Sequence, residues 1–215
     1  MGGGVVWVVP AAKVSLPGTA TMPEGAVGIV AFAHGSGSSR HSPRNRYVAE
    51  VLHAHGIATL LFDLLTPQED RAYETRFDID LLTERLLAAL AWLEASAETK
   101  GLKIGCFGAS TGAAAALRAA AQHASVAAVV SRGGRPDLAG PPALAAVRAP
   151  TLLIVGGRDE GVIELNQQAC ALLQCEKQLE IVPGATHLFE EPGALERAAA
   201  HAAAWFARHL GNARA

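Results

Sequence analysis

The chain has 215 residues, of which 50% are hydrophobic and 18% charged, and its formal net charge is −2 at pH 7. This composition is typical of a folded globular protein and excludes a disordered one, and the length predicts a single domain over residues 1–215. The nearly neutral charge offers no basic surface, so we expect no nucleic-acid partner and no attraction to anionic membranes.

The termini and the cysteines carry no sign of export. The N-terminal residues lack the basic start and long apolar run of a secretory signal, and no stretch approaches the ~20 apolar residues of a membrane span. The three cysteines, Cys106, Cys170 and Cys175, have no metal-ligand spacing, and an odd number argues against a disulfide framework. We therefore expect a cytoplasmic protein without metal or cofactor, in which Cys106 is a buried small hydrophobe.

The first 25 residues combine β-branched pieces with Pro10, Pro17 and Pro23. Proline is tolerated at the edge of a sheet, so this region is expected to form an N-terminal antiparallel β-hairpin of the main sheet.

From Ala26 onward, buried strand patterns alternate with helix patterns. Strands are expected within 26–35, 57–65, 102–110, 126–134, 149–157 and 177–184. Helices are expected within 44–56, 77–96, 111–124, 141–147, 164–174 and 192–210. Continuous apolar strands separated by helices predict a mostly parallel, doubly wound α/β sheet of about eight strands, covered on both faces.

Ser110 lies where one predicted strand passes directly into a helix, within the sequence GASTG. Glycine at both flanks, Gly108 and Gly112, fits a nucleophile elbow, in which a tight turn holds the serine hydroxyl out of the sheet. The alternative is a small-residue turn with an incidental serine. The turn also places the Thr111 N–H at a helix N-terminus, where it can donate to an oxyanion.

The partners that a nucleophilic serine needs follow in chain order. Asp159 comes directly after the segment TLLIVGGR, and His187 follows the next strand, LEIVPG. Serine, acid and histidine at the ends of successive strands form a candidate catalytic triad. Asp159 could instead cap a helix or be a solvated loop acid, and Glu160 is a rival acid. His187 could be an ordinary packed or surface histidine.

A second oxyanion donor is expected from the loop HGSGSSRHSPRN after an earlier strand. Gly35 and Gly37 let the backbone come close, and the Ser36 N–H is the predicted donor. His34 is expected to brace this loop and to transfer no proton. A flexible Gly/Ser turn is the alternative.

Four segments resemble the α/β-hydrolase superfamily and, more narrowly, bacterial proteins related to dienelactone hydrolase: AHGSGSSRHSPRN, GASTGAAAAL, TLLIVGGRDE and GATHLFEEPG. The resemblance implies an eight-stranded, mostly parallel sheet, a Ser/Cys–Asp–His triad, and hydrolysis of esters or lactones without a cofactor. The best-known dienelactone hydrolases use a cysteine nucleophile, whereas this chain has Ser110. The resemblance therefore implies hydrolase chemistry and leaves the substrate open.

The pocket is predicted to be open and built from loops, because about twenty residues between Val130 and Thr151 are too few for a cap domain. Four arginines fall in strand-end loops and could clamp a substrate carboxylate or phosphate: Arg40, Arg44, Arg132 and Arg135. Bracing pairs with Asp63 or Asp137, or ordinary solvation, are the alternatives. Glu190 and Glu191 are expected in the first turn of the last helix.

These features predict a serine hydrolase that acts with water on a small ester, lactone or thioester. A non-catalytic binding or regulatory protein and an acyltransferase are the alternative functions.

Overall fold

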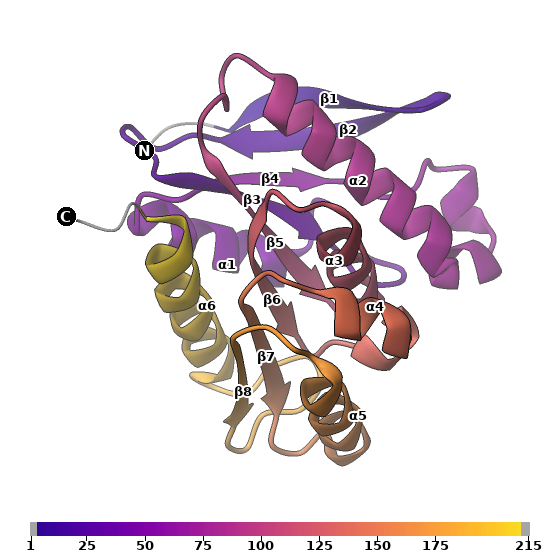
Figure 1. The fold of residues 1–215 in the computed structure, drawn as a ribbon, viewed down its shortest axis with the longest axis vertical. Helices are drawn as coiled ribbons and strands as arrows, with labels where there is room; N and C mark the ends of the chain where they lie inside the picture. The colour runs from indigo at the N-terminus through magenta and orange to yellow at the C-terminus, as the bar shows by residue number, and fades with distance from the viewer. Residues whose placement is uncertain (1–3, 212–215) are drawn as a thin grey trace.

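The computed structural model describes residues 4–211 and contains an eight-stranded sheet with helices on both faces (Figure 1). The strands are β1 (Val5–Ala11), β2 (Val14–Thr21), β3 (Gly28–Ala33), β4 (Ala58–Phe62), β5 (Lys103–Ala109), β6 (Val126–Arg132), β7 (Thr151–Gly156) and β8 (Lys177–Val182). Their spatial order is β1-β2-β4-β3-β5-β6-β7-β8, and β3 to β8 run parallel. The predicted mostly parallel α/β fold is thereby confirmed.

The antiparallel part of the sheet lies at the N-terminal edge. β1 pairs antiparallel with β2, and β2 pairs antiparallel with β4. Pro10 and Pro17 lie on these two strands, within the stretch where a hairpin is expected. Residues 1–3 of that stretch are outside the described residues.

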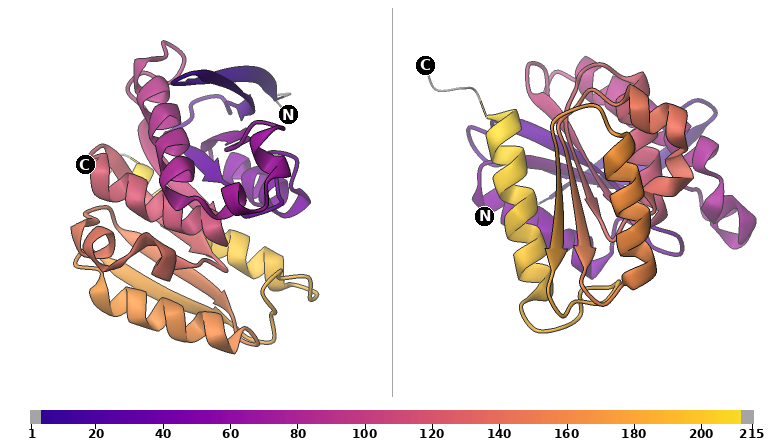
Figure 2. Two further views of the ribbon diagram at one scale, coloured as in Figure 1. Left: turned by 90° about the vertical axis from the view of Figure 1, so that its right-hand side faces the viewer. Right: turned by 60° about the horizontal axis from the view of Figure 1, so that its bottom comes forward.

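The helices form two layers, one on each face of the sheet (Figure 2). On one face lie α1 (Pro43–Ala54) and α6 (Ala194–Leu210), and on the other α2 (Ile79–Ala95), α3 (Thr111–Gln122), α4 (Pro141–Ala146) and α5 (Glu160–Leu172). Each face has its own hydrophobic core. On α3 the alanines 113–116 are completely buried, so their small side chains allow this helix to pack closely on the sheet.

The connections outside these layers are short 3-10 turns. The polar stretch after β4 contains η1 (Glu69–Arg71) and η2 (Glu74–Phe77), and η3 (Pro136–Ala139) precedes α4. Between β6 and β7 the chain forms only η3 and α4, in agreement with the prediction that no cap domain is inserted there. Within residues 4–211, no helix is both long and apolar enough to cross a bilayer.

The strand order reverses at β3. The chain passes from β3 to β4 on one side, and β5 then pairs with β3 on the other side. In open parallel sheets, ligands bind beyond the carboxyl ends of the strands at such a reversal. The loop after β3 and the turn after β5 therefore meet at the expected position of a site.

Candidate active site

Ser110 occupies a strained turn between β5 and α3. Its backbone has φ 50° and ψ −122°, a conformation that side-chain-bearing residues rarely adopt. A Cβ added at Gly108 would lie 2.4 Å from Ala113 Cα, and one added at Gly112 would lie 2.1 Å from the Ala33 carbonyl oxygen. Both glycines are therefore required for the close approach of strand and helix that creates this turn.

The backbone of Ser110 is hydrogen-bonded to the end of β6 and to the loop that follows it. Its N–H donates to the Arg132 carbonyl at 3.4 Å, and its own carbonyl accepts from the Arg135 N–H at 3.1 Å. The strained turn is thus held by hydrogen bonds on both sides.

Asp159 and His187 meet beyond the ends of β7 and β8. Asp159 Oδ2 lies 2.6 Å from His187 Nδ1, so the Nδ1–H donates to the carboxylate and Nε2 is left to face a substrate. Asp159 does precede α5, but its side chain makes no capping hydrogen bond, and Glu160 lies within the helix. The geometry therefore selects Asp159 as the acid that orients His187.

Ser110 and His187 line a common pocket of about 240 Å³. Among the described residues, the hydrogen bond of the His187 ring is the one to Asp159, and none joins the ring to the Ser110 hydroxyl. Such contacts are often long without substrate and tighten in the complex. The pocket is lined by Gly35, Ser36, Ser38, Ser42, Arg44, Asn45, Ala109, Ser110, Arg132, Gly133, His187 and Leu188.

The loop after β3 lies against the elbow. A Cβ added at Gly35 would be 3.0 Å from Ser110 Cβ, so glycine allows this contact. The Ser36 N–H, predicted as an oxyanion donor, donates to Thr111 Oγ1 at 3.0 Å. Thr111 is the first residue of α3, where backbone N–H groups have no intrahelical partner, so its N–H is available to a ligand.

His34 holds this loop in place with a neutral ring. Its Nε2 accepts from the Leu64 N–H at 3.0 Å, and its Nδ1 lies 3.0 Å from the Gly35 carbonyl. Burial lowers the pKa of His34 below its ordinary value, which keeps the acceptor nitrogen unprotonated. The bracing position fits the role that the sequence predicts.

Three of the four candidate arginines are paired with carboxylates. Arg40 binds Asp63 through its side chain and its backbone N–H, and Arg135 binds Asp137 through two nitrogens at 2.9 and 2.7 Å. Arg44 Nη1 lies 3.2 Å from Glu190 at an exposed position, and the Arg44 side chain also lines the pocket.

Arg132 is different because it is buried without a carboxylate. Only 7% of the residue is exposed, Nη2 donates to Asn45 Oδ1 at 3.0 Å, and the guanidinium lies 5.5 Å from the Phe107 ring centroid. Among the described residues, Nη1 has no hydrogen-bond partner. Burial, and then the charge of Arg44, lower the pKa of Arg132 to about 10, so it remains cationic at neutral pH.

Two features of the site were missed by the sequence analysis. Asn45 supplies the amide that holds Arg132, and the Thr111 side chain binds the Ser36 N–H. Both residues stand within quoted motifs, but no pattern indicates where a single amide or hydroxyl points.

The expected positions of Glu190 and Glu191 are wrong. The last helix begins at Ala194, after Gly193 with φ 77°, so both acids precede it. Glu191 accepts instead from the Thr186 N–H at 3.0 Å and braces the loop that carries His187.

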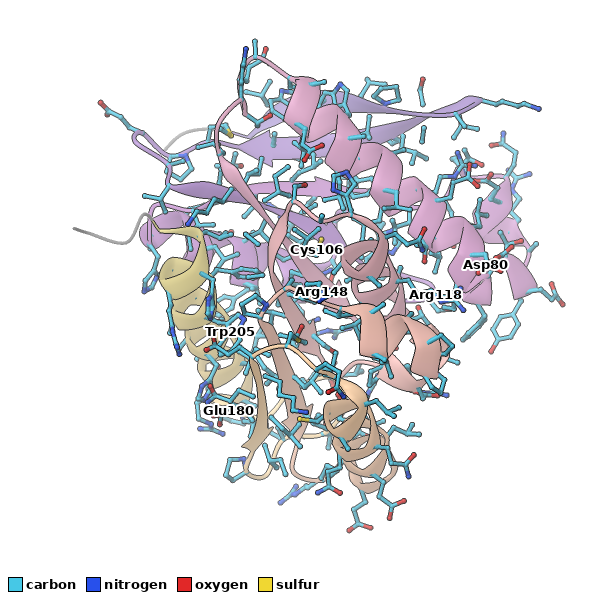
Figure 3. All side chains as sticks on the ribbon, viewed as in Figure 1. Asp80, Cys106, Arg118, Arg148, Glu180 and Trp205 are labelled. Carbon is cyan, nitrogen blue, oxygen red and sulfur yellow. The ribbon has the colours of Figure 1, made fainter. Side chains whose placement is uncertain are left out.

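The cysteine on β5, the strand that leads to Ser110, does not compete with it as a nucleophile. Cys106 is completely buried in β5 (Figure 3), and burial raises its pKa to about 12, which keeps it an unreactive thiol. Residues 4–211 contain no group of three or more His, Cys, Asp or Glu side chains placed to hold a metal ion.

Known proteins are similar to this chain in sequence, in fold, or in both. The model of the dienelactone hydrolase family matches residues 64–209. A dienelactone hydrolase structure from Anabaena variabilis is 56% identical with a TM-score of 0.94, over 96% of this chain and 97% of that one. Est1E from Butyrivibrio proteoclasticus is 16% identical with a TM-score of 0.81, over 98% and 99% of the two chains, and so shares the α/β-hydrolase fold.

A further relative carries a different name. The Mycobacterium tuberculosis protein called "Putative phosphoribosyl transferase Rv0571c" is 61% identical over 203 residues, which are 94% of this chain and 46% of that protein. The chain thus spans about half the length of the curated relative that it matches.

Proposed function

Because the chain belongs to the dienelactone hydrolase family, we propose that this hydrolase cleaves a small carboxylic ester, lactone or thioester through an acyl-enzyme intermediate. The observation that carries the proposal is the 2.6 Å contact of Asp159 with His187, because His187 lines the same pocket as Ser110. Serine, histidine and aspartate in these places have the roles of a catalytic triad.

In the proposed mechanism, Ser110 Oγ attacks the substrate carbonyl carbon while His187 Nε2 accepts the hydroxyl proton. Asp159 keeps the other ring proton on Nδ1 and stabilises the imidazolium. The tetrahedral intermediate collapses, and His187 gives its proton to the departing alkoxide or thiolate. Water, activated by the same imidazole, then attacks the acyl carbon and releases the acid and the free serine.

The strained turn supports a nucleophilic role for Ser110. Strain at a non-glycine residue persists only where surrounding contacts enforce it, and such residues cluster at functional sites. The two hydrogen bonds from the β6 loop enforce the conformation here. A turn with an incidental serine would gain nothing from this strain.

We further propose that the acyl part of the substrate carries an anionic group. Arg132 lines the pocket, is cationic and buried, and within residues 4–211 its guanidinium has a neutral amide and an aromatic ring as its only partners. A buried cation without a counter-ion is costly, and a substrate carboxylate or phosphate would relieve that cost through charge-assisted hydrogen bonds. The pairing of Arg40 and Arg135 with aspartates removes them from this role, while Arg44 can assist at the rim.

The transferase name of the mycobacterial relative describes a protein about twice as long, of which this chain matches 46%, and it does not support a transferase function for this chain.

A cytoplasmic location is part of our proposal and is supported by three free cysteines.

Acyl transfer is an alternative outcome of the same chemistry, and a product analysis distinguishes it from hydrolysis. If the enzyme is a transferase, added alcohol would take up the acyl group and form a new ester.

The primary test is turnover of 4-nitrophenyl acetate by the wild-type protein and by Ser110→Ala, with circular dichroism to verify folding. We expect the variant to lose serine-dependent turnover and labelling by a fluorophosphonate probe, because only an activated serine reacts with it. Wild-type rates in the alanine variant would refute the nucleophile. A wild-type protein that neither turns over the ester nor takes up the probe would be a non-catalytic member of its family.

A further inference from the structure

Asn166 is a buried amide that bonds to the loop after β6. It lies on α5, about two turns after Asp159, and it is completely buried. Its Nδ2 donates to the Gly134 carbonyl at 3.0 Å and to the Val162 carbonyl, one turn earlier on its own helix, at 2.8 Å. Because both acceptors are carbonyl oxygens, the amide nitrogen must face them. The bond to Gly134 therefore joins α5 to the loop.

Packing alone does not account for an amide at this position. Within residues 4–211, the Asn166 Oδ1 has no hydrogen-bond partner. A buried polar atom without a partner is destabilising, and asparagine is a poor helix former in a helix interior. A side chain that only filled this space would be better apolar. The amide is therefore explained by the bond that its nitrogen donates.

The Gly134 carbonyl is next to a hydrogen bond that shapes the nucleophile. The Arg135 N–H donates at 3.1 Å to the carbonyl of Ser110, the residue whose φ is 50°. Two glycines, Gly133 and Gly134, precede Arg135, and glycine has few steric restraints of its own, so neighbouring groups must fix this pair. The Gly133 N–H donates to a carbonyl of β7 at 2.8 Å, and the Gly134 carbonyl accepts from Asn166. The pair is thus held from β7 on one side and from α5 on the other.

We propose that Asn166 is a positioning residue for the nucleophile. By holding the Gly134 carbonyl, it keeps the Arg135 N–H on the Ser110 carbonyl, and it so preserves the strained backbone that presents the hydroxyl. Strain of this kind persists only where the surroundings enforce it. One helix then supports two members of the triad, because Asp159 directly precedes α5 and Asn166 holds the loop at Ser110. This inference rests on the proposed hydrolase function.

The test compares Asn166→Leu, which keeps the branched shape and loses the donor, with Gln167→Leu, which removes an amide from the next, exposed position of α5. We expect Asn166→Leu to lower kcat for 4-nitrophenyl acetate by about 10- to 100-fold with little change in KM, because a small misplacement of a reacting group has an effect of this size. The Gln167 variant should stay within about twofold of the wild type. Asn166→Ala serves in place of leucine if the larger side chain impairs folding, which thermal unfolding will reveal.

A second readout separates positioning from stability. Complete labelling with a fluorophosphonate probe counts the reactive serines, and kcat is then expressed per labelled Ser110. A purely stabilising residue would change the number of labelled sites and leave kcat per site at the wild-type value, whereas misplacement lowers kcat per site and slows the labelling. Wild-type kcat per site in the Asn166→Leu protein, or an equal loss in the Gln167 variant, would overturn the proposal. Absence of Ser110-dependent turnover in the wild type would instead refute the hydrolase itself.

Discussion

Arg132 is held by Asn45 and not by an acid: its Nη2 donates to the Asn45 amide oxygen at 3.0 Å, and the two residues line the pocket of Ser110. Asn45 is 2% exposed and neutral, so it orients the guanidinium without cancelling its charge. Arg40 and Arg135, by comparison, are neutralised by aspartates in the same set of loops. The pocket therefore retains a buried positive charge.

Arg132→Gln should remove a preference for anionic acyl groups. We expect the wild type to favour mono-4-nitrophenyl succinate over 4-nitrophenyl acetate, and the variant to lose about 100-fold in kcat/KM for the succinate, as loss of a ~2–3 kcal/mol charge-assisted hydrogen bond predicts. Turnover of the neutral acetate should change by less than about threefold, because it makes no such bond.

Arg135→Gln is the matched control for this comparison. Its guanidinium is bound to Asp137, so the ratio between the two esters should stay at the wild-type value. If Arg132→Gln lowered kcat/KM equally for both esters, Arg132 would be a structural residue and the anionic-substrate proposal would fail.

Asp159→Asn should lower kcat by about 10³–10⁴-fold with the fold intact, because an amide cannot hold the proton on His187 Nδ1 as a carboxylate does. Glu160→Gln changes the adjacent acid, which lies in the first turn of α5, and should stay within about twofold of the wild type. Steady-state kinetics on 4-nitrophenyl acetate measures both. A larger loss in the Glu160 variant would show that the wrong acid has been assigned.

The positions of the main residues follow from sequence because they depend on strand ends. A glycine-flanked serine between strand and helix, and an acid and a histidine after later strands, are placed by the sheet itself. The choice of Asp159 over Glu160, the partners of the four arginines and the bond from Ser36 to Thr111 depend on side-chain directions. A sequence pattern of period 2 or 3.6 carries no information about those directions in loops. The sequence predicts that the last helix begins at residue 192, whereas α6 begins at Ala194. The positive φ of Gly193, which sets this start, cannot be seen in the composition.

Protonation of His34 should destabilise the protein at low pH. Its ordinary pKa is 6.5, and burial lowers the pKa in the folded state. The unfolded chain therefore takes up a proton as the pH falls through 6.5, while the folded chain resists it, so stability is present above pH 6.5 and is lost as the pH falls toward the folded pKa. This loss is at most about 1.4 kcal/mol per pH unit for one proton.

Urea denaturation at pH 7.5 and 5.5 tests this for the wild type and His34→Gln. The glutamine cannot titrate, yet its amide oxygen can still accept from the Leu64 N–H, so its free energy of unfolding should depend less on pH. His53 and His209, whose pKa values burial also lowers, are present in both proteins and cancel in the difference. Equal pH dependence in the two proteins would exclude His34 as the source.

The hydrogen bonds between the backbone of Ser110 and the β6 loop link the nucleophile to the strand that ends in Arg132. The attacking oxygen and the buried cation are therefore carried by two backbone segments that are hydrogen-bonded to each other. This arrangement would set the distance between the Ser110 hydroxyl and the Arg132 guanidinium, and with it the preferred length of the acyl chain. Among dicarboxylic half-esters, the enzyme would select the number of methylene groups that separates the reacting carbonyl from its distant charge.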